Sequence, residues 1–267
     1  MPEVTSHAPG WPSWVDLHSP DTQRSKEFYT GLFGWDTYTM TVPDFGDREM
    51  FTLGGIQGPE VAGMHPLADD TQPPSWMCYF RSDDIQATME TVKGAGGREL
   101  APPTDLANLG HMALCSDPEG ADFALWTSYN LAGAGVVDEP SAMCWVELAC
   151  RDTEQARRFY NEVFGWKSID VEHSGSDYTK FLLGEDRPLA GMVRMNERWP
   201  RDVPPHWIPY FQVADCDDAA GRAADLGARI LYGPADIPAG RYAVMTDPIG
   251  ARLAVMTPDP AEIPPRA

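Results

Sequence analysis

Two stretches of the chain share one pattern of apolar and polar positions. Residues 14–35 read WVDLHSPDTQRSKEFYTGLFGW and residues 145–166 read WVELACRDTEQARRFYNEVFGW, an offset of 131 residues (145 minus 14). Each stretch begins with an alternating apolar run, which predicts a strand. Apolar residues at helical spacing follow an Asp-Thr pair that suits a helix N-cap, and a glycine lies where the helix would end. The pattern predicts one strand–helix unit used twice, and the long period indicates a duplication.

The strand–helix pattern recurs within each half. In the first half we expect strands at 13–18, 36–42, 49–53 and 61–66, then a second module with a strand at 73–80, a helix over 83–94 and strands near 98–101, 111–116 and 121–126. The second half repeats these signals. The chain is therefore predicted to be an α+β protein of four βαβββ modules in two domains, residues 1–130 and 144–258, with a linker at 131–143 and a Pro-rich tail at 259–267.

Composition agrees with two ordinary globular domains. The chain has 267 residues, of which 43% are hydrophobic and 22% charged. No apolar run reaches the roughly 20 residues that span a bilayer, and the N-terminus carries no basic and then apolar signal segment, so we expect a cytoplasmic protein with no membrane partner. Five cysteines without a CxxC pair indicate buried free thiols rather than a zinc site or disulfides.

The formal net charge of −20 argues against a nucleic-acid partner. Binding to nucleic acid depends on Lys and Arg side chains that neutralise the phosphates. The excess negative charge of this chain would repel those phosphates. The expected partner is a small molecule. The duplication makes the chain its own pseudo-dimer, so a monomer or a further homodimer both remain open.

Two sequence motifs, or marks, occur in each half and are similar to those of a known superfamily. They are the D-x(6)-FY-x(3)-FGW element and a DPxG turn before the last strand, at residues 117–120 and 247–250. Four βαβββ modules with these marks resemble the vicinal oxygen chelate superfamily of glyoxalase I, extradiol dioxygenases, fosfomycin-resistance enzymes and bleomycin-binding proteins. The tandem form is similar to actinobacterial glyoxalase-like proteins, some of them described as hydroxylases. The resemblance implies curved mixed sheets around a cavity, whether the modules pair within a half or between halves.

The resemblance also implies where a divalent metal would be bound. Superfamily enzymes hold the ion with His or Glu on the first strand of a module and Glu on the last. The corresponding positions here are Trp14, Trp145, Met77, Ile208, Ala124 and Ala254. Because these side chains are poor ligands, we expect no cofactor at the usual site.

Carboxylates remain on the predicted cavity face of both first strands. Asp16 and Glu147 lie two residues after the tryptophans, and alternate residues of a strand share a face. If desolvated, each would have a raised proton affinity and would suit general acid–base catalysis. The alternative is that each binds a neighbouring backbone group or an arginine, such as Arg81 for Asp16.

Histidines add a second possibility in the first half. His18 shares the face of Asp16, and His65 lies on the fourth strand of the module. Asp16, His18 and His65, with His111 as a further member, would form an unusual metal or proton-transfer site. The counterparts in the second half are Glu147, Ala149, Val193 and Arg241, so the site exists once.

Aromatic and methionine side chains would line the two cavities and stack on a flat ligand. We expect this of Trp14, Tyr79, Trp126, Trp145 and Tyr210, with Met77, Met112, Met143 and Met192. Trp76, Phe80, Trp207 and Phe211 are expected to face the helices instead.

Three functions follow from these residues. The first is a tailoring or detoxifying enzyme of secondary metabolism, of lyase, isomerase or oxygenase type, that acts on a small aromatic or polyketide-like metabolite without the usual metal. Asp16, Glu147 and His18 would be its catalytic residues. The second is a non-catalytic protein that sequesters a planar drug, as bleomycin-resistance proteins do. The third is a metal-dependent glyoxalase or dioxygenase.

Overall fold

Each half of the chain follows the predicted order of strands and helices. The computed structural model describes residues 3–67, 72–173, 176–184 and 186–260. The first half contains β1 (Pro12–Ser19), α1 (Thr22–Phe33), β2 (Asp36–Val42), β3 (Gly46–Thr52), β4 (Glu60–Pro66), β5 (Ser75–Arg81), α2 (Ile85–Gly94), β6 (Arg98–Leu106), β7 (Gly110–Ser116) and β8 (Asp122–Ser128). The predicted βαβββ modules are confirmed.

The second half repeats this order. It contains β9 (Met143–Cys150), α3 (Thr153–Phe164), β10 (Lys167–His173), β11 (Ser176–Leu183), β12 (Arg187–Arg194), β13 (His206–Gln212), α4 (Cys216–Asp225), β14 (Arg229–Ile237), β15 (Gly240–Thr246) and β16 (Arg252–Pro258). The predicted tail lies outside the described residues from position 261 onward, and the proposed domain limits stay a prediction.

The helix boundaries follow from local sequence. The Asp21 carboxylate caps α1 by accepting a hydrogen bond from the Arg24 amide, and the Asp152 carboxylate caps α3 in the same way. Both helices end at a glycine in the left-handed region, with φ of 70° at Gly34 and 71° at Gly165. The N-cap aspartates and C-terminal glycines that predicted these helices therefore also begin and end them in the structure.

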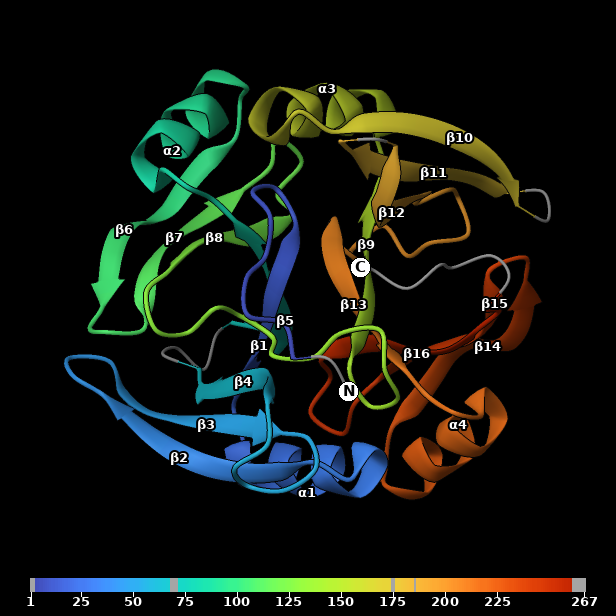
Figure 1. The fold of residues 1–267 in the computed structure, drawn as a ribbon. Helices are drawn as coiled ribbons and strands as arrows, with labels where there is room; N and C mark the ends of the chain where they lie inside the picture. Colours follow the sequence, from blue (N-terminus) through green and yellow to red (C-terminus); the bar gives the residue numbers. More distant parts are fainter. Residues whose placement is uncertain (1–2, 68–71, 174–175, 185, 261–267) are drawn as a thin grey trace.

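The modules pair within each half. The strand order is β2-β3-β4-β1-β5-β8-β7-β6 in one eight-stranded sheet and β10-β11-β12-β9-β13-β16-β15-β14 in the other. Each sheet is continuous because β1 pairs antiparallel with β5, and β9 with β13. Pairing, which the sequence left open, is thus settled, and each curled sheet presents one face to its helices and one inner face away from them (Figure 1).

The helix-side faces of both sheets share one core. Helix α1 lies beside α4, and α2 beside α3, so each helix contacts one of the other half (Figure 1). The Tyr29 hydroxyl donates to Asp247 Oδ2 at 2.8 Å, and the equivalent Tyr160 hydroxyl donates to Asp117 Oδ2 at 3.2 Å. Trp76, Phe80, Trp207 and Phe211 belong to this shared core, as predicted.

The segment between the halves packs against the first half. Its Ala134 amide donates to the Ser13 carbonyl, and its Gly135 amide donates to the Glu60 carbonyl. Ala134 is fully buried on the inner face of the first sheet. The predicted linker therefore closes part of that face as well as connecting the halves.

All five cysteines are buried and free, which confirms the prediction made from their spacing. Among the described residues, the helices are too short or too polar to cross a membrane.

Candidate functional site: a buried carboxylate cluster on the inner face of the first sheet

Strand β1 carries the candidate residues because its side chains alternate between two environments. Val15 and Leu17 face the core shared with the helices. Trp14, Asp16 and His18 therefore lie on the opposite, inner face. Asp16 is only 5% exposed there, which is unusual for a carboxylate and requires compensating partners.

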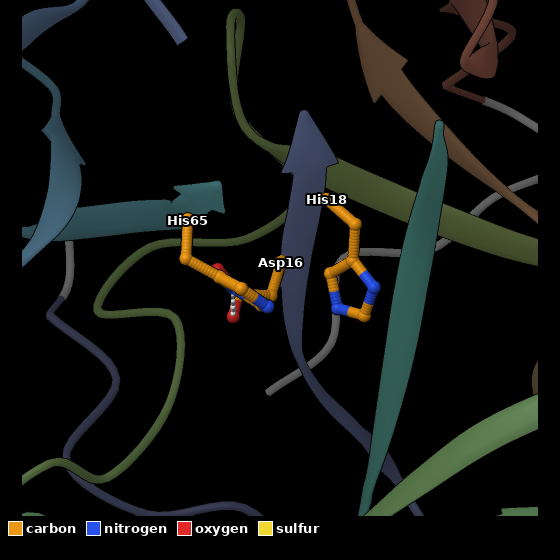
Figure 2. Close-up of side chains that lie close together, drawn as sticks. All are labelled: Asp16, His18 and His65. Atoms are coloured by element: carbon orange, nitrogen blue, oxygen red, sulfur yellow. Dashed lines mark hydrogen bonds and ion pairs between the residues drawn. The ribbon is translucent and has the colours of Figure 1, made fainter. Parts of the chain in front are cut away.

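The partners of Asp16 come from two other strands of its module. His65 on β4 lies with Nδ1 at 2.9 Å from Asp16 Oδ2, and Arg48 on β3 donates from Nη1 to the same oxygen at 3.3 Å. Figure 2 shows His65 and Asp16 directed toward one another. An ionised carboxylate can only accept, so a proton on His65 Nδ1 satisfies Asp16, whereas Arg48 Nη1, 2.9 Å from the same Nδ1, can only donate and favours the proton on Nε2.

Electrostatics keep Asp16 ionised. Burial alone raises its pKa, but the opposing effects of His65, Arg48 and His18 outweigh burial and hold the pKa below its usual value. The prediction of a raised proton affinity is therefore wrong for Asp16. Arg81 is not its partner either, since Arg81 pairs with Asp83; Arg48 has that role.

His18 completes the cluster. Its ring centroid lies 4.2 Å from that of His65. Burial, together with the nearby His65, lowers the pKa of His18 to about 4, so its ring is neutral at physiological pH. Asp16, His18 and His65 each offer a ligand atom, and these atoms lie within 4.8 Å of one another.

His111 does not join this cluster. It lies on β7 with Ala113 and Cys115 at alternate positions, and those two residues face the shared core. Met112 and Leu114, at the intervening positions, pack against the inner-face group. The strand alternation therefore directs His111 away from Asp16, and its prediction as a member of the site is wrong.

The donor set of the cluster fits a divalent ion in kind but not in its present arrangement. One carboxylate and two imidazoles are ordinary ligands for a transition metal. However, Arg48 Nη1 lies 2.9 Å from His65 Nδ1 as well as 3.3 Å from Asp16 Oδ2. The guanidinium charge already occupies the space beside these two ligand atoms, and an ion there would be repelled.

Apolar side chains surround the cluster on the inner face. Trp14, Met77, Tyr79 and Trp126 form one buried group with the partly buried Met112. The Tyr79 hydroxyl also bonds to the Asp16 carboxylate, and burial together with this carboxylate raises the pKa of Tyr79. These residues share the inner face with Asp16, and their role in lining a cavity for a flat ligand stays a prediction.

The second half carries a different group at the matching place. Trp145 and Tyr210 lie on its inner face, where Ile208 and Ala254 are also buried. Met143 and Met192, predicted to lie beside the ligand, instead belong to the core shared with the helices. For Met143 the register shift beside it interrupts the alternation that would otherwise place it on the face of Trp145. Met192 pairs with Leu148, which also faces the shared core.

The donors to Glu147 are neutral hydroxyls, whereas those to Asp16 include the Arg48 guanidinium. The carboxyl group is hydrogen-bonded to Tyr178 and Tyr210, and burial raises its pKa to about 7. Trp145 Nε1 donates in turn to the Tyr178 hydroxyl at 3.0 Å. Here the predicted rise in proton affinity is confirmed.

The ladder register explains the difference between the halves. In the second sheet, Tyr178 on β11 pairs with Val193 on β12. In the first sheet, Glu49 on β3 pairs with Met64 on β4, and the adjacent residues Arg48 and His65 are in contact. Tyr178 therefore corresponds to Arg48, and Val193 to His65. Sequence analysis missed both Arg48 and Tyr178. Arg48 lies two residues before Met50, which faces the inner side, so alternation along β3 would have predicted an inner-facing Arg48.

Glu147 should make the stability of the fold fall as pH rises. Its pKa is about 7 in the folded chain against an ordinary 4.5, so the folded state binds more protons between these values and loses up to about 3 kcal/mol of stability across that window. We expect Glu147→Gln to unfold at higher urea than the parent chain at pH 8 and at the same urea at pH 4. A pH-independent difference would contradict the assignment.

Comparison with known proteins places the chain in a family. The model of the Glyoxalase/Bleomycin resistance protein/Dioxygenase superfamily matches residues 11–125 and 142–255. The chain belongs to this superfamily, as a tandem member with one matched region in each half.

Two named relatives span nearly the whole chain. "Putative glyoxylase CFP32" of Mycobacterium bovis is 36% identical over 264 residues, which cover 98% of this chain and 100% of the relative. "Anthracycline biosynthesis protein DnrV" of Streptomyces peucetius is 37% identical over 264 residues and 95% of each chain.

Solved structures share the fold at low identity. The Mn(II)-bound glyoxalase from Novosphingobium aromaticivorans has a TM-score of 0.64 at 17% identity, with 93% of this chain and 82% of that chain covered. The 2,3-dioxygenase LapB from Pseudomonas sp. KL28 has a TM-score of 0.62 at 13% identity, with 94% and 93% covered. These likenesses define the fold and leave the activity to the site.

Proposed function

We propose that the chain is an acid–base enzyme of the glyoxalase superfamily that transfers a proton at a carbon next to a carbonyl of a small aromatic or polyketide-like metabolite. The observation that carries the proposal is the imidazole of His65 held by the buried Asp16 carboxylate at 2.9 Å. An imidazole oriented in this way by a carboxylate is an effective base, because the carboxylate fixes the tautomer and stabilises the imidazolium that forms.

Each member of the cluster has a role in this proposal. His65 Nε2 accepts the substrate proton, and Asp16 is the positioning residue that keeps Nδ1 protonated. The guanidinium of Arg48 supplies positive charge beside the imidazole, where negative charge develops on the substrate oxygen. Trp14, Met77 and Trp126 would stack on and enclose a flat ligand.

The class of metabolite is supported by the relatives and by the lining. A relative that covers 95% of this chain is named for anthracycline biosynthesis. The aromatic lining of the first inner face is compatible with a planar ring system. Deuterium exchange into 2-tetralone, an aromatic ketone with an acidic α-hydrogen, tests the chemistry directly by NMR.

We expect the full chain to exchange 2-tetralone faster than buffer alone. Trp14→Leu should lower kcat/KM by about tenfold through KM, because it removes a binding surface and leaves His65 in place. Trp145→Leu, the matched change 131 residues later, should leave the rate within about twofold. Absence of exchange above the buffer rate, or equal losses for both variants, would contradict the proposal.

A sequestering protein is a second candidate, favoured by the same aromatic group. It would quench tryptophan fluorescence on binding quinizarin, a planar hydroxyanthraquinone, and return every tested aromatic ketone unchanged. A metal-dependent glyoxalase or dioxygenase is a third candidate, favoured by the spacing of Asp16, His18 and His65. Stoichiometric metal in the chain after incubation with iron, manganese, nickel or zinc and desalting would favour this candidate over the first.

A further inference from the structure

A pocket unrelated to the carboxylate cluster lies in the second half. Its volume is about 990 Å³, and it is formed by the end of β9 and the loop between β12 and β13. The side chains that matter in its lining are Arg151, Arg194, Arg198, Arg201, Met195, Trp199 and Glu197. We call it the arginine pocket.

Its charge is opposite to that of the chain. The protein has a net charge of −20 and only 20 basic residues, yet four of them line this one pocket with a single acidic lining residue, Glu197. Gathering four guanidinium groups costs Coulomb energy, which a bound anion would recover. Guanidinium groups are also the donors best matched to carboxylate geometry.

The loop is held in place before any ligand binds. Arg151 Nη2 donates to the carbonyls of Pro200 and Val203, each at 3.0 Å. The Arg198 amide donates to Asn196 Oδ1 at 3.0 Å, and the Trp199 amide donates to the Asn196 carbonyl at 3.0 Å. A pocket shaped in advance loses less conformational entropy on binding.

Trp199 supplies an aromatic surface within the pocket. It packs against the buried inner group of the second sheet, and the Arg252 guanidinium lies 5.6 Å from its ring centroid. Arg252 Nη1 donates to His206 Nε2 at 2.7 Å, and His206 Nδ1 donates to the Pro204 carbonyl at 2.7 Å. The inner group of the second sheet and Arg252 thus hold the Trp199 ring in place, and Arg252 adds one more positive charge near the pocket.

We propose that the arginine pocket binds a small aromatic carboxylate, with the carboxylate on Arg198 and Arg201 and the ring against Trp199 and Met195. Both arginines are exposed, so their side chains are able to close on an anion. The volume is large enough to accommodate a ligand of two or three fused rings. This site lies in the half that does not contain the Asp16 cluster and does not depend on the function proposed for that cluster.

Isothermal titration of the full chain with 2-naphthoate, and with the neutral 2-naphthamide as the matched ligand, tests the proposal. We expect 2-naphthoate to bind at least about tenfold more tightly than 2-naphthamide, with an affinity that falls as salt is added. Arg198→Gln combined with Arg201→Gln should raise the Kd of 2-naphthoate at least about tenfold. Arg24→Gln, an exposed arginine on α1 of the other half, should leave it unchanged.

The outcomes separate the pocket from the carboxylate cluster. Trp199→Leu should weaken both ligands, and Asp16→Asn should weaken neither. No binding of 2-naphthoate, equal binding of the acid and the amide, or an unchanged Kd in the double variant would each overturn the proposal. Loss of binding in Asp16→Asn with retention in the double variant would move the ligand to the first half and overturn it as well.

Discussion

Asp16→Asn is expected to lower the rate of proton exchange by about 10²- to 10⁴-fold. The substitution removes the 2.9 Å interaction between the carboxylate oxygen Oδ2 of Asp16 and His65 Nδ1. Asn cannot stabilise the imidazolium of His65, and its amide would favour the wrong tautomer of that ring. The measurement is the rate of deuterium exchange into 2-tetralone as a function of pH.

Glu147→Gln is the matched control for this variant. Glu147 occupies the equivalent place 131 residues later, but tyrosines rather than His and Arg contact it. We expect its exchange rate to stay within about threefold of the parent chain. His65→Gln should match Asp16→Asn in its loss, and the double variant should lose no more than either change alone, because the two residues act as a unit. Additive losses would show that Asp16 acts independently of His65.

Asp16→Asn also tests the electrostatic balance of the cluster. The change leaves Arg48, whose side chain is largely buried, beside a neutral partner. Removing one partner of a buried pair costs about 3–5 kcal/mol in typical cases, so urea unfolding should be monitored and rates measured well below the midpoint. A rate loss without any loss of folded protein separates catalysis from stability.

The fold could be predicted because its signals are local and repeated. Alternation, N-cap aspartates and C-terminal glycines each act within a few residues, and the structure uses Asp21, Asp152, Gly34 and Gly165 as the sequence indicates. Module pairing could not be predicted, since β1 and β5 are joined by hydrogen bonds between segments about 60 residues apart, to which no local pattern corresponds.

Two sequence marks are parts of one interaction. The tyrosine of each FY pair donates to the aspartate of the DPxG turn in the other half, as Tyr29 does to Asp247. The other oxygen of that aspartate accepts the amides of residues 249–251, which shapes the turn. Each mark is explained by packing between the halves and not by chemistry at the site, which is why the superfamily marks define the fold but leave the reaction open.

Site residues were predicted only where the alternation within a single strand indicates which face of the sheet a side chain lies on. Asp16 and His18 follow from the alternation of β1, and His65 from the fourth strand. Arg48 was missed because its role depends on the register between β3 and β4. Burial raises the pKa of both equivalent carboxyl groups, but at Asp16 the effects of His65 and Arg48 outweigh burial, whereas at Glu147 the hydrogen bonds from Tyr210 and Tyr178 do not.

Arg48→Met is expected to convert the carboxylate cluster into a metal site. A unit charge about 4 Å from another contributes about 4 kcal/mol at an effective dielectric constant of about 20, and a divalent ion would be repelled more strongly than that. After relaxation of the neighbours, we expect Co²⁺ to bind Asp16, His18 and His65 at least about 100-fold more tightly in Arg48→Met than in the parent chain. The measurement is the visible absorption of Co²⁺ together with the metal content after desalting.

Two further variants decide whether charge is the cause. Arg48→Lys keeps a positive charge near Asp16 and should stay as weak toward Co²⁺ as the parent chain, whereas Arg48→Met combined with His65→Gln should lose the gained affinity because a ligand is missing. If the parent chain retains one Co²⁺ per chain with Arg48 in place, the guanidinium does not exclude the ion, and the metal-dependent candidate replaces the acid–base proposal. If Arg48→Met binds no Co²⁺ while it remains folded, the geometry of the three ligands and not the charge of Arg48 keeps the ion out.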